Sequence, residues 1–144
     1  MRAWVTVAIA TMLTTIGVGC TAQARAPQPV PVDRAECARC RMLISSESGA
    51  GQIVSPRDET RFYDDVGCLA ADWAAHGDDA TAFVRTGSAW RDATAASFAR
   101  PDGSRTAMDS GFVAFATEAE AKAADSAGRA LSWNDVVRIV ESRQ

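Results

Sequence analysis

Apolar residues follow three patterns along the chain. Residues 3–18 form a predominantly apolar run, without charged residues, that starts directly after Arg2. Later, short apolar or alternating stretches bounded by turn residues are typical of β-strands, and apolar residues three or four positions apart are typical of amphipathic helices. The pattern therefore predicts a leader segment followed by a folded part with both strands and helices.

The short stretches predict strands that are punctuated by turn residues. Pro56 ends one of them, and the turn at 101–103 separates the last one from those before it. The expected strands are residues 42–46, 52–55, 61–64, 81–86, 90–93 and 111–116.

Helices are predicted where a capping residue precedes a helical apolar stripe or a good helix-forming stretch. In the second helix, Glu120 stands in the capping-box position. The expected caps and helices are Asp65 with residues 66–76, Thr117 with residues 118–127, and Ser132 with residues 133–142.

A weak internal echo links two of these helix starts. The run Tyr63-Asp64-Asp65-Val66 resembles Trp133-Asn134-Asp135-Val136. A duplication would explain the echo, and so would the general similarity of helix starts. We predict an α+β fold with two small similar lobes, residues 34–86 and 87–144, each a short antiparallel sheet with one or two helices.

The N-terminus predicts export. A basic start, an apolar run and a small residue before the cut describe a secretory signal, and Cys20 after Gly19 is typical of a lipoprotein signal over residues 1–19. An ordinary signal peptide with a chance cysteine is the alternative. Lipid on Cys20 would anchor the protein to the periplasmic face of a bacterial membrane, and Thr21 favours the outer membrane.

Residues 20–33 are expected to form a lipidated tether. Pro27, Pro29 and Pro31 alternate there, which favours extended polyproline geometry over packing. The folded domain is expected to span residues 34–144.

Composition narrows the class of function. Hydrophobic residues make up 47% and the net charge is −3, which excludes wholesale disorder and argues against a nucleic-acid binder. There is no Gly-rich phosphate loop and no arguable Ser/His/Asp arrangement. We therefore expect neither an enzyme nor a protein that takes a small-molecule substrate.

The cysteine and methionine residues of the folded part are its most informative candidates for a functional site. Cys37, Cys40 and Met42 lie in one short run, and Met108 lies in a loop before the strongest strand. Thiolates and thioethers are soft donors that favour Cu(I). We predict one Cu(I) held by Cys37, Cys40, Met42 and Met108.

Other interpretations of the cysteines stay open. Cys37 and Cys40 could form a disulfide, or a redox dithiol, although no helix start accompanies them. A zinc site could use Cys37, Cys40, Cys68 and His76, but a single helix over 66–76 would separate the last two. Cys68 is a possible auxiliary ligand, His76 more often a helix-end charge, and Asp65 a helix cap.

Taken together, these motifs resemble the NosL-type periplasmic copper lipoproteins, accessory proteins of nitrous oxide reductase. The resemblance spans residues 34–137 and rests on the order of several motifs. They are Cys20, the run 37–42, the run 62–68 (Phe-Tyr-Asp-Asp-Val-Gly-Cys), residues 90–93, Met108 with Gly111, and residues 131–133 (Leu-Ser-Trp).

The resemblance implies Cu(I) binding and copper delivery without catalysis, with a cuproenzyme such as nitrous oxide reductase as the recipient. Two runs depart from the family pattern. Arg41 stands where the family's first run usually has glycine, and Ala107 and Asp109 flank Met108 where proline and glycine are usual. Positive charge from Arg41 would weaken a cation site unless that side chain points outward.

Overall fold

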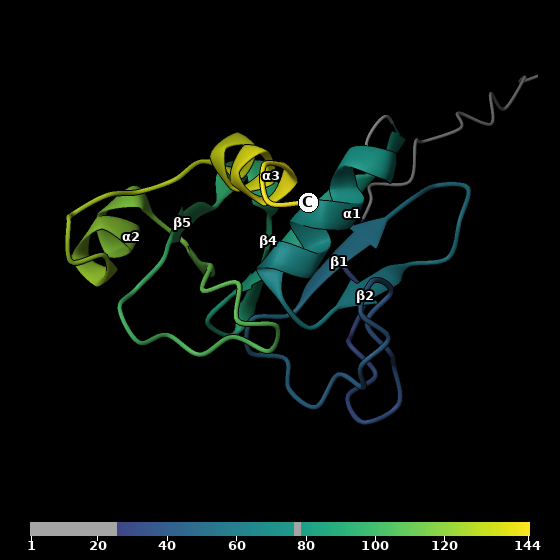
Figure 1. Ribbon diagram of the computed structural model, residues 1–144. Coiled ribbons are helices and arrows are strands. Elements are labelled where there is room, and N and C mark those ends of the chain that lie inside the picture. Colours follow the sequence, from purple (N-terminus) through teal and green to yellow (C-terminus); the bar gives the residue numbers. More distant parts are fainter. Residues whose placement is uncertain (1–25, 77–78) are drawn as a thin grey trace, which may run out of the picture.

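The computed structural model describes residues 26–76 and 79–144 and confirms the α+β class. The elements are β1 (Gly51–Val54), β2 (Arg61–Tyr63), α1 (Val66–His76), β3 (Thr81–Thr86), β4 (Ala89–Asp92), the 3₁₀ turn η2 (Ala93–Ala95), β5 (Ser97–Ala99), β6 (Val113–Phe115), α2 (Glu118–Ala124) and α3 (Trp133–Glu141). Helix α1 follows the first two strands, and helices α2 and α3 close the chain; Figure 1 shows their arrangement.

Two antiparallel sheets form in the described part of the chain. The larger has the strand order β2-β1-β3-β4, and the smaller pairs β5 with β6. In the larger sheet, Gly51 lies opposite both Tyr63 and Val84. Since β4 pairs with β3, this sheet extends to Asp92, past residue 86 where the first lobe was expected to end.

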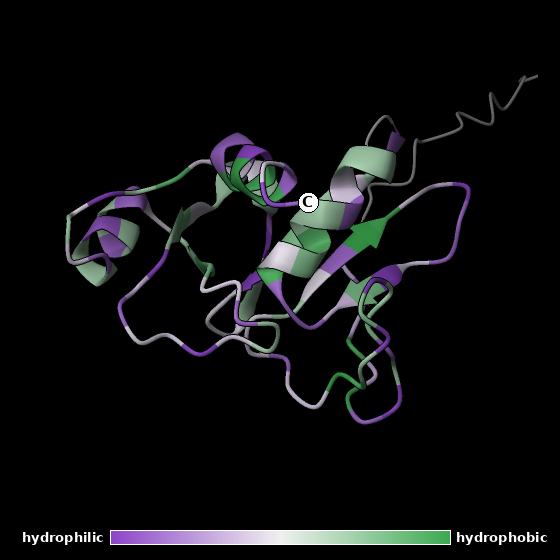
Figure 2. Ribbon diagram, viewed as in Figure 1, coloured by the Kyte–Doolittle hydropathy of each residue, from purple (hydrophilic) through white to green (hydrophobic). Residues whose placement is uncertain are grey.

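Helix α1 lies across the larger sheet and against α3 (Figure 1). Its Leu69 is fully buried over β1, where a Cβ on Gly51 would lie 2.7 Å from the Leu69 Cδ2 atom. Only a glycine lets helix and strand approach this closely. Figure 2 shows apolar residues gathered on β1, α1 and the inner side of α3.

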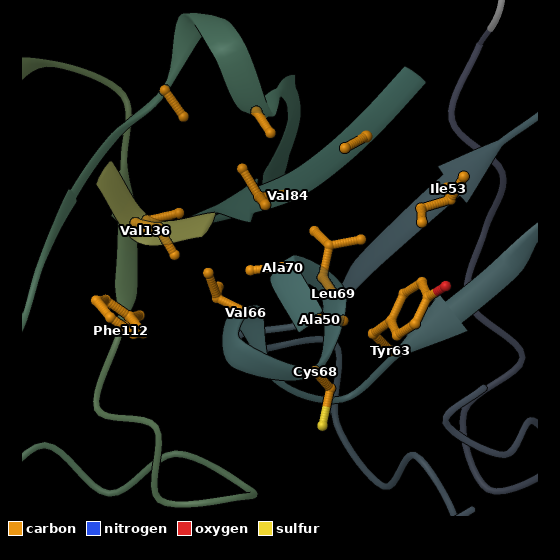
Figure 3. Packing of buried hydrophobic residues seen from close by; sticks show 14 of the residues in the cluster. Ala50, Ile53, Tyr63, Val66, Cys68, Leu69, Ala70, Val84, Phe112 and Val136 are labelled. Carbon is orange, nitrogen blue, oxygen red and sulfur yellow. The ribbon is translucent and has the colours of Figure 1, made fainter. Parts of the chain in front are cut away.

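A hydrophobic cluster spans both sheets. Trp133 of α3 lies edge-on to Trp73 of α1 at 6.2 Å between ring centroids, and at 5.7 Å from Phe98 of β5. Phe112 and Val136 join the same cluster as Leu69 and Val84 (Figure 3). The parts of the chain before and after residue 86 therefore share a core.

The predicted helix starts are confirmed. Helix α1 has the predicted bounds, and the Asp65 Oδ1 atom accepts from the Gly67 N–H at its start. Thr117 with Glu120 and Ser132 with Asp135 form capping boxes. Helix α2 ends at Ala124, before the expected residue 127, because Asp125 takes an extended conformation and its carboxylate accepts from the Ala127 N–H.

The internal echo does not correspond to equivalent structure. Tyr63 is the last residue of a strand, whereas its counterpart Trp133 is the first residue of a helix. Asp65 precedes its helix, but Asp135 lies inside the first turn of α3. The two motifs therefore give no support for a duplication.

The strand expected at residues 42–46 is wrong, and β5 was missed. Residues 33–44 instead fold back on themselves as a narrow hairpin, with an isolated bridge between Glu36 and Leu43. Leu43 is 52% exposed, so the apolar run that suggested a strand is not buried along its length. Strand β5 has three residues, of which only Phe98 is a strong strand former, so it carries little strand signal.

The proline-rich segment packs from Gln28 onward, which corrects the expectation of an unpacked tether up to Asp33. The Gln28 N–H donates to the Gln52 Oε1 atom at 2.8 Å, and the Gln52 Nε2 atom donates to the Gln28 carbonyl at 2.9 Å. Val30 is buried in the core cluster. Cys20 and the expected signal lie outside the described residues, and no helix within the described ranges is long and apolar enough to cross a membrane.

Candidate metal centre

Three thiols and one carboxylate meet at one end of α1. The Sγ atoms of Cys37, Cys40 and Cys68 and a carboxylate oxygen of Asp64 all lie within 4.8 Å of one another. They come from separate parts of the fold: the hairpin, the residue after β2, and the first turn of α1. A group of this composition could hold a metal ion.

The hairpin of residues 33–44 supplies Cys37 and Cys40 from its tip. The Cys37 N–H donates to the Met42 carbonyl at 2.8 Å, and the Arg41 N–H donates to the Cys37 carbonyl at 2.9 Å. The Ala38 N–H donates to the Phe62 carbonyl at 2.8 Å, which fastens the tip to β2. These bonds turn the chain so that both thiols face Asp64.

Arg41 and Asp109 both have a left-handed backbone. Their φ angles are 67° and 55°, a region in which glycine is the residue with least strain. These are the two positions where the resemblance leads one to expect glycine. The Arg41 guanidinium pairs with Glu36 at 2.7 Å on the exposed surface, so its charge is turned outward.

Asp64 and Cys68 are brought to the thiols by the junction of β2 and α1. The chain leaves the sheet at Tyr63, and Cys68 is the third residue of the helix. Figure 3 shows the Cys68 sulfur pointing away from Leu69 and Ala70, which pack into the core. Cys68 was an auxiliary candidate; Asp64 was missed, because nothing local distinguishes it from the neighbouring helix cap, Asp65.

The pKa values of the three thiols are shifted in different directions. A hydrogen bond from the Cys68 thiol lowers the pKa of Cys37 far below its ordinary value, and the same bond, together with burial, raises the pKa of Cys68. Burial also raises the pKa of Cys40, whose Sγ atom lies 3.7 Å from both Asp64 carboxylate oxygens. Burial first, then the Cys37 thiol, raises the pKa of Asp64 to about 6.

This donor set fits a soft metal ion. Thiolates bind Cu(I) and Zn²⁺, while a carboxylate oxygen is an accepted ligand of Zn²⁺ and a weaker partner for Cu(I). Cys37 and Cys68 are buried, and Cys40 is partly exposed. The site is therefore closed on its core side and open at Cys40.

The predicted thioether ligands lie on the two loops beside this centre. The Met42 side chain is 51% exposed, and that of Met108 is 43% exposed. The Met108 N–H donates to the Asp65 Oδ2 atom at 3.0 Å, which brings its loop next to the start of α1. Metal ligation by either thioether stays a prediction.

Two other interpretations change. Cys37 and Cys40 are free thiols here, not a disulfide. In the zinc set, Asp64 takes the place expected for His76, which is the last residue of α1, whereas Cys68 lies in its first turn.

Comparison of the chain with models of protein families and with the sequences of curated proteins gives no match.

Proposed function

We propose that this protein is a periplasmic, lipid-anchored carrier that binds one Cu(I) and delivers it to a cuproenzyme. The convergence of Cys37, Cys40 and Cys68 with Asp64 within 4.8 Å carries this proposal. The anchor would be Cys20. The recipient, by the resemblance to NosL-type lipoproteins, would be nitrous oxide reductase.

The chemistry of the donors supports Cu(I). Three sulfur donors disfavour hard cations such as Mg²⁺ and Ca²⁺, which take oxygen ligands. Met42 and Met108 add neutral soft donors at the exposed rim. A thiolate and thioethers together match the single charge and the softness of Cu(I).

The asymmetry of burial supports a carrier over a permanent cage. Cys37 and Cys68 are buried, but Cys40 and both methionines are accessible. An incoming ligand from a partner would reach the metal on the Cys40 side first. A site that opens ligand by ligand allows transfer without unfolding.

The same asymmetry argues against a thiol-disulfide oxidoreductase. Such an enzyme needs one thiol that is both accessible and ionised. Here the thiol with the lowered pKa, Cys37, is fully buried, and the accessible Cys40 has a raised pKa. We therefore propose a binding role and no catalysis.

A structural Zn²⁺ site is the second candidate. Its specific support is Asp64, because three cysteines and one oxygen form the four-ligand set that tetrahedral Zn²⁺ accepts. A structural ion would tie the hairpin to α1 and would be needed for folding.

Chelator competition separates these candidates. The full chain, reduced and free of metal, is titrated with Cu(I) and separately with Zn²⁺ against a coloured chelator. We expect one Cu(I) per chain, with affinity lowered at least tenfold by Cys68→Ser and less by Asp64→Asn. Asp102→Asn, in the exposed turn at 101–104, is the matched control for the carboxylate and should bind like wild type.

Three other outcomes would count against Cu(I) delivery. Zn²⁺ that binds through these four residues and raises the melting temperature, without tight Cu(I), would favour the structural site. Cu(I) binding that is insensitive to Cys40→Ala and Cys68→Ser would place the metal elsewhere. Binding of neither ion would refute a metal centre.

A further inference from the structure

The Met108 loop (residues 104–111) is docked onto the first turn of α1 by a single buried carboxylate. Asp65 is 1% exposed. Its Oδ1 atom accepts from the Gly67 N–H at 2.6 Å, and its Oδ2 atom accepts from the Met108 N–H at 3.0 Å. One side chain therefore caps the helix and holds a loop that lies 43 residues further along the chain.

A close backbone approach supports this contact. A Cβ built on Gly67 would lie 2.5 Å from the Cβ atom of Ser110, so the helix and the loop touch where no side chain separates them. The loop is also braced from within, because the Gly111 N–H donates to the Thr106 Oγ1 atom at 3.1 Å. Its position relative to α1 is therefore well determined.

Both docking points lie between two metal-centre residues along the chain. Asp65 follows Asp64 directly, and Gly67 precedes Cys68 directly. The loop is thus attached to the short stretch that brings the carboxylate and the third thiol together. The Met108 side chain is 43% exposed and is therefore accessible to a metal ion.

We propose that Asp65 is a positioning residue that holds the Met108 thioether beside the thiols, so that Met108 completes the metal centre from the second half of the chain. This inference rests on the proposed metal-binding function and extends it. A loop fixed in advance loses less conformational entropy when its side chain binds. Without the carboxylate, the loop is no longer held at the start of α1.

Asp65→Asn is the variant that tests this role. The amide has the shape of the carboxylate but only one oxygen, so one of the two backbone N–H groups loses its acceptor however the amide is turned. In the metal-free chain, we expect faster hydrogen exchange at the Met108 amide, at the Gly67 amide, or at both. Asp135→Asn is the matched control, since it weakens the cap of α3 without touching the loop.

Ligation of the metal by a methionine is followed through the magnetic-resonance signal of its ε-methyl group. With methyl-labelled methionine, Met→Leu variants assign the signals of Met42 and Met108, the two methionines that follow the expected signal segment. On addition of Cu(I), we expect the Met108 signal to shift in the wild type and to shift little in Asp65→Asn. The Met42 signal should shift in both.

A double-mutant cycle distinguishes positioning from a general loss of stability. Asp65→Asn should lower Cu(I) affinity about tenfold in the wild type, because the Met108 loop must then be ordered when the metal binds. In the Met108→Leu background, it should lower affinity no further. An equal loss in both backgrounds would mean that Asp65 is merely structural and would overturn the proposal.

Gly67→Ala serves if Asp65→Asn fails to fold. The added methyl pushes Ser110 and its loop away while Asp65 stays intact, and it should reduce the Met108 shift in the same way. If wild-type Met108 does not respond to Cu(I) while Cys68→Ser abolishes binding, the proposed function stands and this inference fails. If Cu(I) does not bind at all, both fail.

Discussion

At the scale of single residues, the backbone at Arg41 and Asp109 adopts a conformation that favours glycine. Arg41 and Asp109 replace glycines expected from the family resemblance, and both have positive φ angles. A side chain in the left-handed region costs about 1–2 kcal/mol, and least for Asp and Asn. The hairpin tip and the Met108 loop are therefore held in shape against a local preference.

Arg41→Gly should stabilise the protein. Relief of the left-handed strain outweighs the greater freedom of glycine in the unfolded chain, so we expect the free energy of unfolding to rise by about 0.5–1 kcal/mol. The exposed pair with Glu36 that is lost contributes little. Chemical denaturation of the metal-free protein measures the change.

Arg39→Gly is the matched control in the same loop. Its φ is not positive, so the substitution should destabilise the protein. If both variants lose stability alike, the left-handed geometry of Arg41 is not a source of strain. Cu(I) affinity should be unchanged in Arg41→Gly, because the guanidinium points away from the thiols.

Asp64 is expected to bind the metal ion and, when ionised, to lower the stability of the metal-free protein. Its pKa is raised to about 6 from an ordinary value of 3.8, so the folded protein binds this proton more tightly than the unfolded chain does. Its contribution to stability is complete below pH 3.8 and is lost as pH rises through 6. Above that range the ionised, partly desolvated carboxylate destabilises the apo protein.

Asp64→Asn should therefore raise the melting temperature of the apo protein at pH 7 and flatten its dependence on pH between 4 and 6. Metal affinity should fall in the same variant, because a ligand is lost. The measurement is thermal unfolding of both proteins across this pH range. A variant that is less stable than wild type at pH 7 would show that the carboxylate supports the fold.

At the scale of elements, the metal centre depends on junctions between strands, helices and loops. The hairpin tip is fastened to β2 through the Phe62 carbonyl, and the end of β2 leads directly into α1. Gln52 plays a similar part on β1, where its buried side chain pairs with the backbone of Gln28. The Gln52 side-chain amide thus forms the two hydrogen bonds that the backbone of a neighbouring strand would otherwise form with Gln28.

Gln52→Leu should release the segment that precedes the hairpin. Both hydrogen bonds to Gln28 are lost, and we expect proteolytic cleavage within residues 26–32 to become at least several-fold faster, with a modest loss of stability. Limited proteolysis followed by mass spectrometry measures the effect.

Gln28→Ala is the control, since Gln28 contributes its backbone and not its side chain to this pairing. It should be cleaved like wild type. Equal cleavage of wild type and Gln52→Leu would mean that Val30, buried in the core, holds the segment by itself.

At the scale of the whole molecule, the two sheets pack on one shared hydrophobic core. Trp133 of α3 contacts both Trp73 of α1 and Phe98 of β5, and the Met108 loop crosses from β5 to β6 by way of the α1 start. Residues from both halves therefore meet at the start of α1.

Local features of the sequence determined much of the fold. The helix over 66–76, the capping box at Thr117, the N-cap at Ser132 and the strand over 81–86 were predicted because each depends on residues within a few positions of one another. The soft donors at 37–42 were evident for the same reason. In the candidate site, the sequence alone identified Cys37 and Cys40, and kept Cys68 as an auxiliary.

Tertiary structure decided what depends on contacts between distant residues. It brought Asp64 and Cys68 to the hairpin, gave Asp65 a second partner in Met108, and packed a proline-rich segment that looked like a free tether. It also left residues 42–46 without a sheet partner and paired 97–99 instead. Such contacts form only when the core brings the segments together, because their free energy comes from burial and hydrogen bonds between residues with no relation in the linear pattern.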